Sequence, residues 1–258
     1  MPTPPALPLI FGNHQAQYPV TRRIKFNTRV DVAANGAEQR FVDNNPLFSF
    51  SFPFNSMTYT DEQSLLTFFN ARLGMFETDW TAILGTQTYA NLTFESDTFQ
   101  MMRSDPLTYE LSLNFKQTQN LGYPLGTPTG FPVLTSGLPF QRPYSMSYRN
   151  LTVAGDSPTG TRYTYAFRNA GVSGFPPGVL HGWKLSYPVL SDADTAIIEA
   201  FFVASQGRYQ TFTFLDDAVP TPNSYGFCRF GEDELALIYR GPNWTECSFS
   251  VVEFSNLW

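Results

Sequence analysis

The chain has 258 residues, of which 42% are hydrophobic, 16% aromatic and 15% charged, enough for two modest packed domains or one large β domain. Its charge is acidic, with 22 Asp and Glu against 16 Lys and Arg, and no run of basic residues supplies the stripe that tight nucleic-acid binding requires. This composition excludes a wholly disordered chain, a polyelectrolyte and a coiled coil.

The first eleven residues are apolar, but prolines interrupt them and no cation precedes Arg22. A secretory signal needs a positive segment and a helical apolar core, and no later stretch reaches the ~20 apolar residues of a membrane span. We therefore expect a soluble chain that is not exported and does not enter a membrane.

Two segments of the first half alternate apolar and polar residues with the period of a strand. They are residues 48–52, Phe-Ser-Phe-Ser-Phe, and residues 111–115, Leu-Ser-Leu-Asn-Phe. Successive side chains of a strand point to opposite faces, so this pattern predicts strands with one buried face.

A helix of about fifteen residues is predicted between these strands. Thr58 and Asp61 have the spacing of a capping box in which Asp replaces the usual Glu. The apolar residues that follow share one helical face, because their spacing is i, i+3, i+4; they are Leu65, Phe68 and Phe69. Gly74 stands where a left-handed C′ residue would end the helix.

Residues 121–139 are saturated with Gly and Pro and show no helical period, which indicates a linker and not core. We therefore predict a first repeat with an N-terminal arm at residues 1–120, a Gly/Pro-rich linker at 121–143 and a second repeat at 144–258.

The second half resembles the first. Residues 58–76 align without gaps onto residues 191–209, with five identities in nineteen positions. The second helix then has Ser191 and Asp194 at its start, Ile198, Phe201 and Phe202 on its apolar face, and Gly207 at its end. A second block recurs 136 positions later: Tyr89, Phe94, Asp97, Pro106, Glu110 and Ser112 become Tyr225, Phe230, Asp233, Pro242, Glu246 and Ser248.

Strand-like alternation also surrounds the second helix, at residues 183–187, 211–214 and 247–251. Self-similarity at a fixed spacing is the signature of a repeated structural unit. The predicted fold is mainly β with one helix per repeat, an α+β class in which two tandem domains are related by internal duplication.

Residues that could carry nucleophilic chemistry are few. His14 and His181 lie in Pro/Gly-rich contexts away from any nucleophile motif, so loop histidines without a catalytic role are favoured. Cys228 and Cys247 allow a disulfide or half of a metal site, but two buried small hydrophobes in neighbouring strands are the preferred interpretation. No phosphate-binding glycine motif is present in the sequence.

Two carboxylate clusters allow metal binding or acid/base chemistry. They are Asp216-Asp217 and Glu232-Asp233-Glu234. Their spacing matches no calcium loop, and solvated turn carboxylates are favoured. The 25 Phe and 13 Tyr residues fall mostly at predicted core positions rather than on a binding platform. We expect no catalytic residue, no cofactor and no metal.

Two series of residues resemble the minor and distal tail proteins of long-tailed bacteriophages and gene transfer agents. The first is Thr28-Arg29-Val30, Asn35-Gly36-Ala37-Glu38-Gln39-Arg40, an aromatic strand, Thr58-x-x-Asp61 and Leu65-x-x-Phe68-Phe69-x-Ala71-Arg72-x-Gly74. The second is Phe201-Phe202-x-Ala204-x-x-Gly207-x-Tyr209-x-x-Phe212-x-Phe214-x-Asp216, followed by Cys228-Arg229-Phe230.

The resemblance covers roughly residues 18–118 and 144–254, and two departures accompany it. The second copy lacks the Gly-x-x-Gln-Arg turn and offers only Gly160-Thr-Arg162. Members of the family more often carry one unit, so the duplication puts the usual ring stoichiometry in doubt.

The resemblance implies tail-tube-like β-sandwich domains and a structural, non-enzymatic virion protein. Such a protein forms a ring at the tail tip that joins the tail tube protein to the hub or baseplate proteins. The implied location is the virion tail, with assembly in the host cytoplasm and no membrane partner. DNA would cross the lumen only in transit, and an acidic wall would repel its phosphates.

Duplication has a consequence for the ring. Six single units and three double units present the same number of units around an axis, so a hexamer or a pseudo-six-fold trimer is expected, with the hexamer preferred because the tail rings that the chain resembles are hexameric.

Two other functions stay open from the sequence. A carbohydrate-binding module for the host cell surface would use exposed aromatics such as Trp80, Trp183 or Trp244. A hydrolase would need two facing carboxylates in a pocket.

Overall fold

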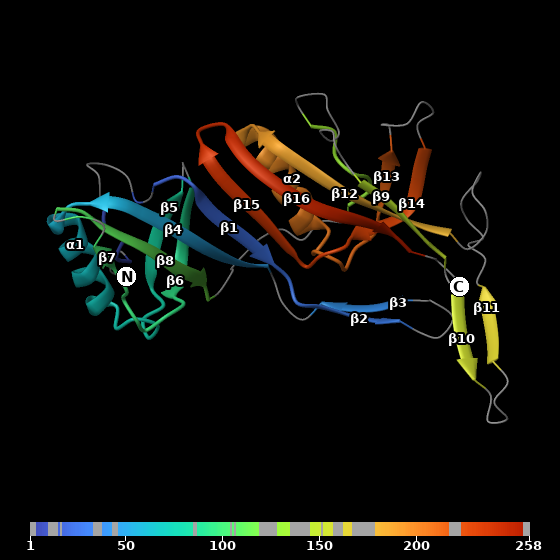
Figure 1. Cartoon of the computed structure of the whole chain (residues 1–258), viewed down its shortest axis with the longest axis horizontal. Coiled ribbons are helices and arrows are strands. Elements are labelled where there is room, and N and C mark those ends of the chain that lie inside the picture. The colour runs from blue at the N-terminus through green and yellow to red at the C-terminus, as the bar shows by residue number, and fades with distance from the viewer. Residues whose placement is uncertain are drawn as a thin grey trace. The chain divides into compact units, whose positions relative to one another are not determined.

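The computed structural model describes residues 4–9, 15, 17–32, 38–42, 46–84, 87–103, 105, 107–118, 128–134, 145–150, 152–156, 162–166, 179–216 and 223–254. The chain is mainly β with antiparallel pairing and two helices (Figure 1). It divides into two compact units. Unit 1 holds residues 1–25, 46–123 and 236–246, and unit 2 holds residues 26–45, 124–235 and 247–258.

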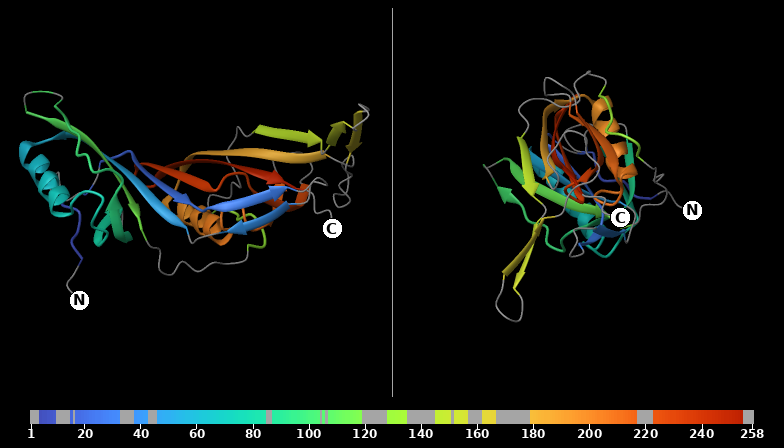
Figure 2. Two further views of the ribbon diagram at one scale, coloured as in Figure 1. Left: turned by 90° about the horizontal axis from the view of Figure 1, so that it is seen from below. Right: turned by 90° about the vertical axis from the view of Figure 1, so that its right-hand side faces the viewer.

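Unit 1 contains one helix and an antiparallel sheet. Its elements are β1 (Val20–Lys25), β4 (Leu47–Met57), α1 (Tyr59–Ala71), β5 (Trp80–Leu84), β6 (Gln87–Phe94), β7 (Met102–Arg103) and β8 (Tyr109–Gln117). The strands are ordered β5-β6-β8-β4-β1, and β7 pairs with β8. Figure 2 shows α1 running alongside these strands.

Aromatic side chains of the predicted strands form the core of unit 1. Alternate residues of β4 point inward, and all are almost fully buried: Phe48, Phe50, Phe52 and Phe54. Phe50 lies opposite Phe115 of β8, and their rings stack at 5.1 Å. The helix adds Leu65 and Phe69, whose ring lies 5.0 Å from that of Phe94 on β6. The buried face of the strands and the apolar face of the helix therefore pack together in one apolar layer.

Unit 2 has the same kinds of elements. They are β2 (Thr28–Val32), β3 (Glu38–Val42), β9 (Ser145–Asn150), β10 (Thr152–Asp156), β11 (Arg162–Ala166), β12 (Val179–Leu190), α2 (Asp192–Ala204), β13 (Phe212–Asp216) and β14 (Asn223–Phe230). Two further strands, β15 (Glu234–Gly241) and β16 (Trp244–Glu253), each have residues in both units. The strand order in unit 2 is β13-β14-β16-β12-β9, and β2-β3 and β10-β11 form separate pairs.

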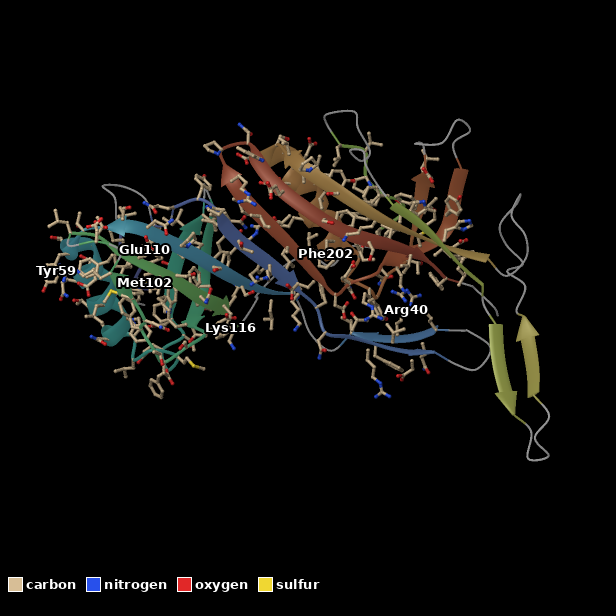
Figure 3. The ribbon with its side chains drawn as sticks, in the orientation of Figure 1. Arg40, Tyr59, Met102, Glu110, Lys116 and Phe202 are labelled. Carbon is tan, nitrogen blue, oxygen red and sulfur yellow. The ribbon has the colours of Figure 1, made fainter. Side chains whose placement is uncertain are left out.

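The core of unit 2 is also aromatic. Phe202 of α2, labelled in Figure 3, lies 4.9 Å ring to ring from Phe230 of β14. Part of the stretch expected to be a linker belongs to this core, because Leu134 is buried and the ring of Phe131 lies 5.5 Å from that of Phe214. Its prolines and glycines end regular structure without preventing apolar side chains from packing. The domain boundaries at 121 and 143 stay a prediction.

Both helices begin as predicted and end one residue differently. The Thr58 hydroxyl accepts the Asp61 N–H in a full capping box, and Ser191 accepts the Asp194 N–H in the same way. Gly74 and Gly207 have the predicted left-handed backbone, with φ of 60° each. They occupy C″ and not C′, because the residue before each glycine, Leu73 or Gln206, is already left-handed.

Elements of the two units correspond in length and register. Helices α1 and α2 both have 13 residues and start 133 positions apart. The β6-β8 pairs and the β14-β16 pairs match residue for residue at a spacing of 136, from Leu92↔Gln117 and Cys228↔Glu253 to Phe94↔Phe115 and Phe230↔Val251.

Earlier elements also match, at a spacing of 124. The β2-β3 pairs run from Thr28↔Val42 to Val32↔Glu38, and the β10-β11 pairs run from Thr152↔Ala166 to Asp156↔Arg162. The segments before them match too, since the Leu7 N–H donates to the Thr81 carbonyl and the Phe131 N–H donates to the Thr213 carbonyl, both at 2.8 Å.

Within the described part of the chain, no helix is long and apolar enough to cross a membrane.

We predict that Gly74→Ala or Gly207→Ala lowers the free energy of unfolding by about 2 kcal/mol, or about 4–8 °C in Tm. An added Cβ would lie 2.6 Å from Asp97 Oδ1 or 2.7 Å from Asp233 Oδ1, on a backbone that L residues rarely adopt. Thermal unfolding measures the effect. The control is Gly226→Ala, whose Cβ meets nothing within 4 Å and which should change stability by less than about 0.5 kcal/mol. Equal effects at 226 and at 74 or 207 would contradict the account.

Candidate interaction site

In unit 2, Asp233 joins three segments that are far apart in the sequence. Its carboxylate accepts the Arg208 N–H at 3.0 Å, directly after the left-handed Gly207 that ends α2. The other carboxylate oxygen accepts the N–H of Thr28 at 2.7 Å, where β2 begins. The Asp233 carbonyl accepts the N–H of Phe26 at 2.9 Å. Charge-assisted bonds of this kind are about twice as strong as neutral ones, so Asp233 fixes the entry of β2 into unit 2.

Phe26 fills the space beside the end of α2. Its side chain is 1% exposed, and its ring lies 5.9 Å from that of Phe202. A Cβ on Gly207 would be 3.3 Å from Phe26 atoms, so the absence of a side chain at 207 lets the ring approach. The site binds an incoming segment by one aromatic side chain and its flanking backbone N–H groups.

The β2-β3 hairpin is also held by a buried ion pair. Glu38 receives two hydrogen bonds from the Arg229 guanidinium, both at 2.9 Å, with the two side chains 8% and 9% exposed. The Arg40 guanidinium, labelled in Figure 3, lies 4.7 Å from the centre of the Phe254 ring. Burial lowers the pKa of Arg40, because desolvation disfavours its charged form, and the negative charge of Glu38 opposes this shift.

Unit 1 contains the same helix end with no such segment among the described residues. Asp97 accepts the Met75 N–H at 2.8 Å, directly after the left-handed Gly74. A groove of about 620 Å³ lies here, lined by Phe69, Asn70, Leu73, Gly74, Met75, Phe76 and Asp97. We call it the unit 1 groove.

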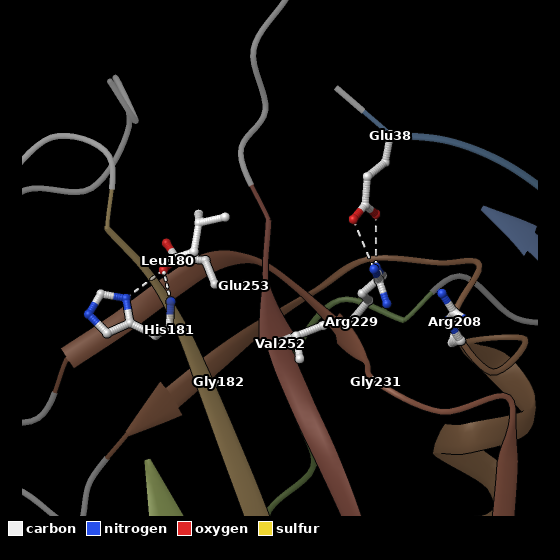
Figure 4. Close-up of a pocket in the computed structure, with 9 residues that line it drawn as sticks. All are labelled: Glu38, Leu180, His181, Gly182, Arg208, Arg229, Gly231, Val252 and Glu253. Carbon is white, nitrogen blue, oxygen red and sulfur yellow. Dashed lines mark hydrogen bonds and ion pairs between the residues drawn. The ribbon is translucent and has the colours of Figure 1, made fainter. Parts of the chain in front are cut away.

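A cavity of about 230 Å³ in unit 2 is lined by several titratable residues, which are the candidates for acid/base chemistry (Figure 4). His181 lies here on β12 and is buried, so the expectation of a loop histidine is wrong: its strand places it against Glu253, with Nδ1 to Oε2 at 2.5 Å. The second carboxylate of the cavity is Glu38, which Arg229 engages. Both carboxylates that line the cavity are therefore engaged, Glu253 with an imidazole and Glu38 with a guanidinium. His14 lies outside the described residues.

The two cysteines are free and buried, on β14 and β16, as the preferred interpretation predicts. Burial raises the pKa of the Cys228 thiol well above its ordinary value and that of Cys247 to about 12. A nucleophile needs the thiolate, so neither residue is suited to catalysis.

The carboxylate clusters are not simple solvated turns. Asp216 is 1% exposed and accepts the Trp183 indole N–H at 3.1 Å, because its strand turns it inward. Asp233 holds segments together as described, whereas Glu232 is exposed and accepts from Ser250. Asp217 lies outside the described residues. No group of three or more potential metal ligands occurs among the residues that the structure describes.

The aromatic residues named for sugar binding are mostly core. Trp80 and Trp183 are 0% and 1% exposed, because they lie at inward positions of β5 and β12, so their expected exposure is wrong. Trp244 is 47% exposed.

The site residues that the sequence indicated only indirectly are Phe26, Thr28 and Arg229. The recurrence of Asp97 as Asp233 was the signal that could have identified the site, because a repeated carboxylate beside a repeated helix-ending glycine suggests a shared local structure.

Comparison of the chain with protein-family models and with curated protein sequences finds no match.

Replacing Arg229 by alanine should lower the free energy of unfolding by about 3 kcal/mol, because Glu38 would keep a buried charge without its partner. The matched control is Arg29→Ala on the same hairpin, where the pair with Asp31 is 72% and 47% exposed and should contribute less than about 1 kcal/mol. Denaturant unfolding compares the two. Equal losses would show that the Glu38 pair does not fasten the hairpin.

The thiol environment gives a chemical prediction. At pH 8 the native protein should not react with a thiol reagent, because raised pKa values keep both cysteines protonated and burial blocks access. Thiolate forms only as the pH rises through the raised pKa, so native reactivity stays low up to about pH 10. Both thiols should react in guanidinium. Rapid reaction of either thiol in the native protein would overturn the assignment.

Proposed function

We propose that the chain is a tandem duplication of one tail-tube-like β-sandwich unit. The support is the repeated register of β6-β8 and β14-β16, the equal helices and the equivalent left-handed glycines. Chance similarity of short apolar patterns does not require the same residue pairs at a spacing of 136 and the same helix ends at a spacing of 133. In this proposal the Pro-rich stretch before each repeat is equivalent, because Leu7 and Phe131 make the same backbone hydrogen bond.

On this basis the protein is a structural ring component of the tail tip of a phage. The observation that carries the proposal is that β2-β3 follows β1 of unit 1 in the chain but belongs to unit 2. One repeat thus supplies a segment that completes the next, which is the type of head-to-tail link that generates closed rings. The partners would be further copies of the chain, the tail tube protein and the hub or baseplate proteins.

The chemistry of the described residues agrees with a non-enzymatic role. Four titratable groups of the unit 2 cavity are engaged in pairs, His181 with Glu253 and Arg229 with Glu38, and burial raises the pKa of both cysteines. The acidic balance of the chain suits a lumen that DNA crosses without adhering. A hydrolase lacks support among the described residues because each cavity carboxylate is paired, Glu38 with Arg229 and Glu253 with His181.

A carbohydrate-binding module is the weaker alternative. It would need a cluster of exposed aromatic side chains, but two of the three candidate tryptophans are core residues.

Native mass spectrometry of the purified chain tests the ring. We expect a closed cyclic oligomer, either a hexamer or a trimer with pseudo-six-fold symmetry. A monomer at all accessible concentrations would contradict the proposal, whereas binding of oligosaccharides by the monomer would favour the alternative.

A further inference from the structure

The unit 1 groove exposes apolar side chains whose counterparts in unit 2 are less exposed. Leu73, Met75 and Phe76 are 61%, 43% and 75% exposed. The residues at the same positions after α2 are Gln206, which is 8% exposed, and Arg208 and Tyr209, which are half-buried. Three neighbouring apolar side chains at a helix end make a surface that a protein partner can cover.

The covering segment in unit 2 identifies what the groove is shaped to receive. Beside Gly207 lies Phe26, but beside Gly74 an added Cβ would meet only Asp97. Asp233 uses its second carboxylate oxygen for the Thr28 N–H, and the Gln206 carbonyl accepts from the Thr28 hydroxyl at 3.5 Å. The groove therefore has an equivalent carboxylate and an equivalent left-handed backbone, at Asp97 and Leu73.

The second hairpin of the chain is the equivalent of the segment that fills unit 2. Strands β10 and β11 match β2 and β3 at a spacing of 124, which places Thr152 at the position of Thr28. Strand β9 precedes this hairpin and pairs with β12, as β1 precedes the first hairpin and pairs with β4. At this spacing Asn150 stands at the position of Phe26. The apolar residue of the second hairpin is Leu151, one position later.

We propose that the β10-β11 hairpin of one copy docks into the unit 1 groove of a second copy, with the Thr152 backbone directed to the Asp97 carboxylate. The proposal rests on the proposed duplication and ring, and it names the surfaces that form the ring contact. Each copy would then present one hairpin and one groove, a heterologous contact that repeats from copy to copy.

Charge complementarity supports this occupant. Asp97 is an exposed carboxylate that lines the groove, and the segment from β9 to β11 carries Arg149 and Arg162 against one acidic residue, Asp156. Opposite charges around an apolar contact select the partner and its register. The ion pair of unit 2 is not reproduced, because Thr93 and Arg162 stand at the positions of Arg229 and Glu38.

Photo-crosslinking tests the contact directly. The chain carries p-benzoylphenylalanine at position 76, and equal amounts of ¹⁴N and ¹⁵N protein are mixed, assembled and irradiated. Mass spectrometry should find crosslinks from position 76 to residues 145–170 in mixed-isotope pairs. The same probe at Leu107, which is 80% exposed in unit 1 outside the groove, should give none to that segment.

A substitution gives an independent measurement. Phe76→Glu should raise the concentration for half-assembly about tenfold or more without changing the Tm of the monomer, because this side chain is mostly exposed. Leu107→Glu should leave assembly unchanged.

The outcomes separate the two proposals. Assembly of a ring that is unaffected by Phe76→Glu, or crosslinks from position 76 to a different segment or only within one copy, would overturn the hairpin contact and keep the ring. Failure of the wild-type chain to assemble would overturn both.

Discussion

The Asp233 carboxylate is the interaction on which the arrangement of unit 2 depends. It binds the N–H that follows the helix-ending glycine and the N–H at the start of β2, and so it joins the end of α2 to a hairpin about 180 residues earlier in the sequence. Such a carboxylate works only where the backbone turns its N–H groups outward, and the left-handed residues at 206 and 207 provide that turn. The strained backbone, the missing side chain at 207 and the carboxylate form one device.

The same device in unit 1 has half of its bonds among the described residues. Asp97 accepts the N–H after Gly74, but the apolar residues around it are exposed and a groove lies where Phe26 packs in the other unit. The left-handed Leu73 and the buried Gly74 beside this groove support the proposal that a segment of another copy binds there. The difference between the two units therefore identifies the two surfaces of the proposed contact, the β10-β11 hairpin and the unit 1 groove.

The sequence predicted the elements well where period and capping chemistry agree. The strands around Phe48–Phe52 and Trp183–Tyr187, both helices and the left-handed glycines are confirmed, because each depends on local spacing. Contacts between residues far apart in the sequence could not be predicted from it. The residues next to Glu38 in the sequence do not indicate that it pairs with Arg229. His181 was assigned to a loop because the residues before it are rich in Pro and Gly, although it lies in the long strand β12. The membership of residues 26–45 in unit 2 also has no local signature, because it depends on contacts with residues far along the chain.

A cryo-EM reconstruction of the assembled ring tests the central claim, that repeat-to-repeat exchange of a hairpin builds the assembly. We expect density for residues 152–166 of one copy against Gly74, Phe76 and Asp97 of its neighbour, with three-fold or six-fold symmetry. A ring in which that groove is open to solvent, or is filled by a different protein, would contradict it.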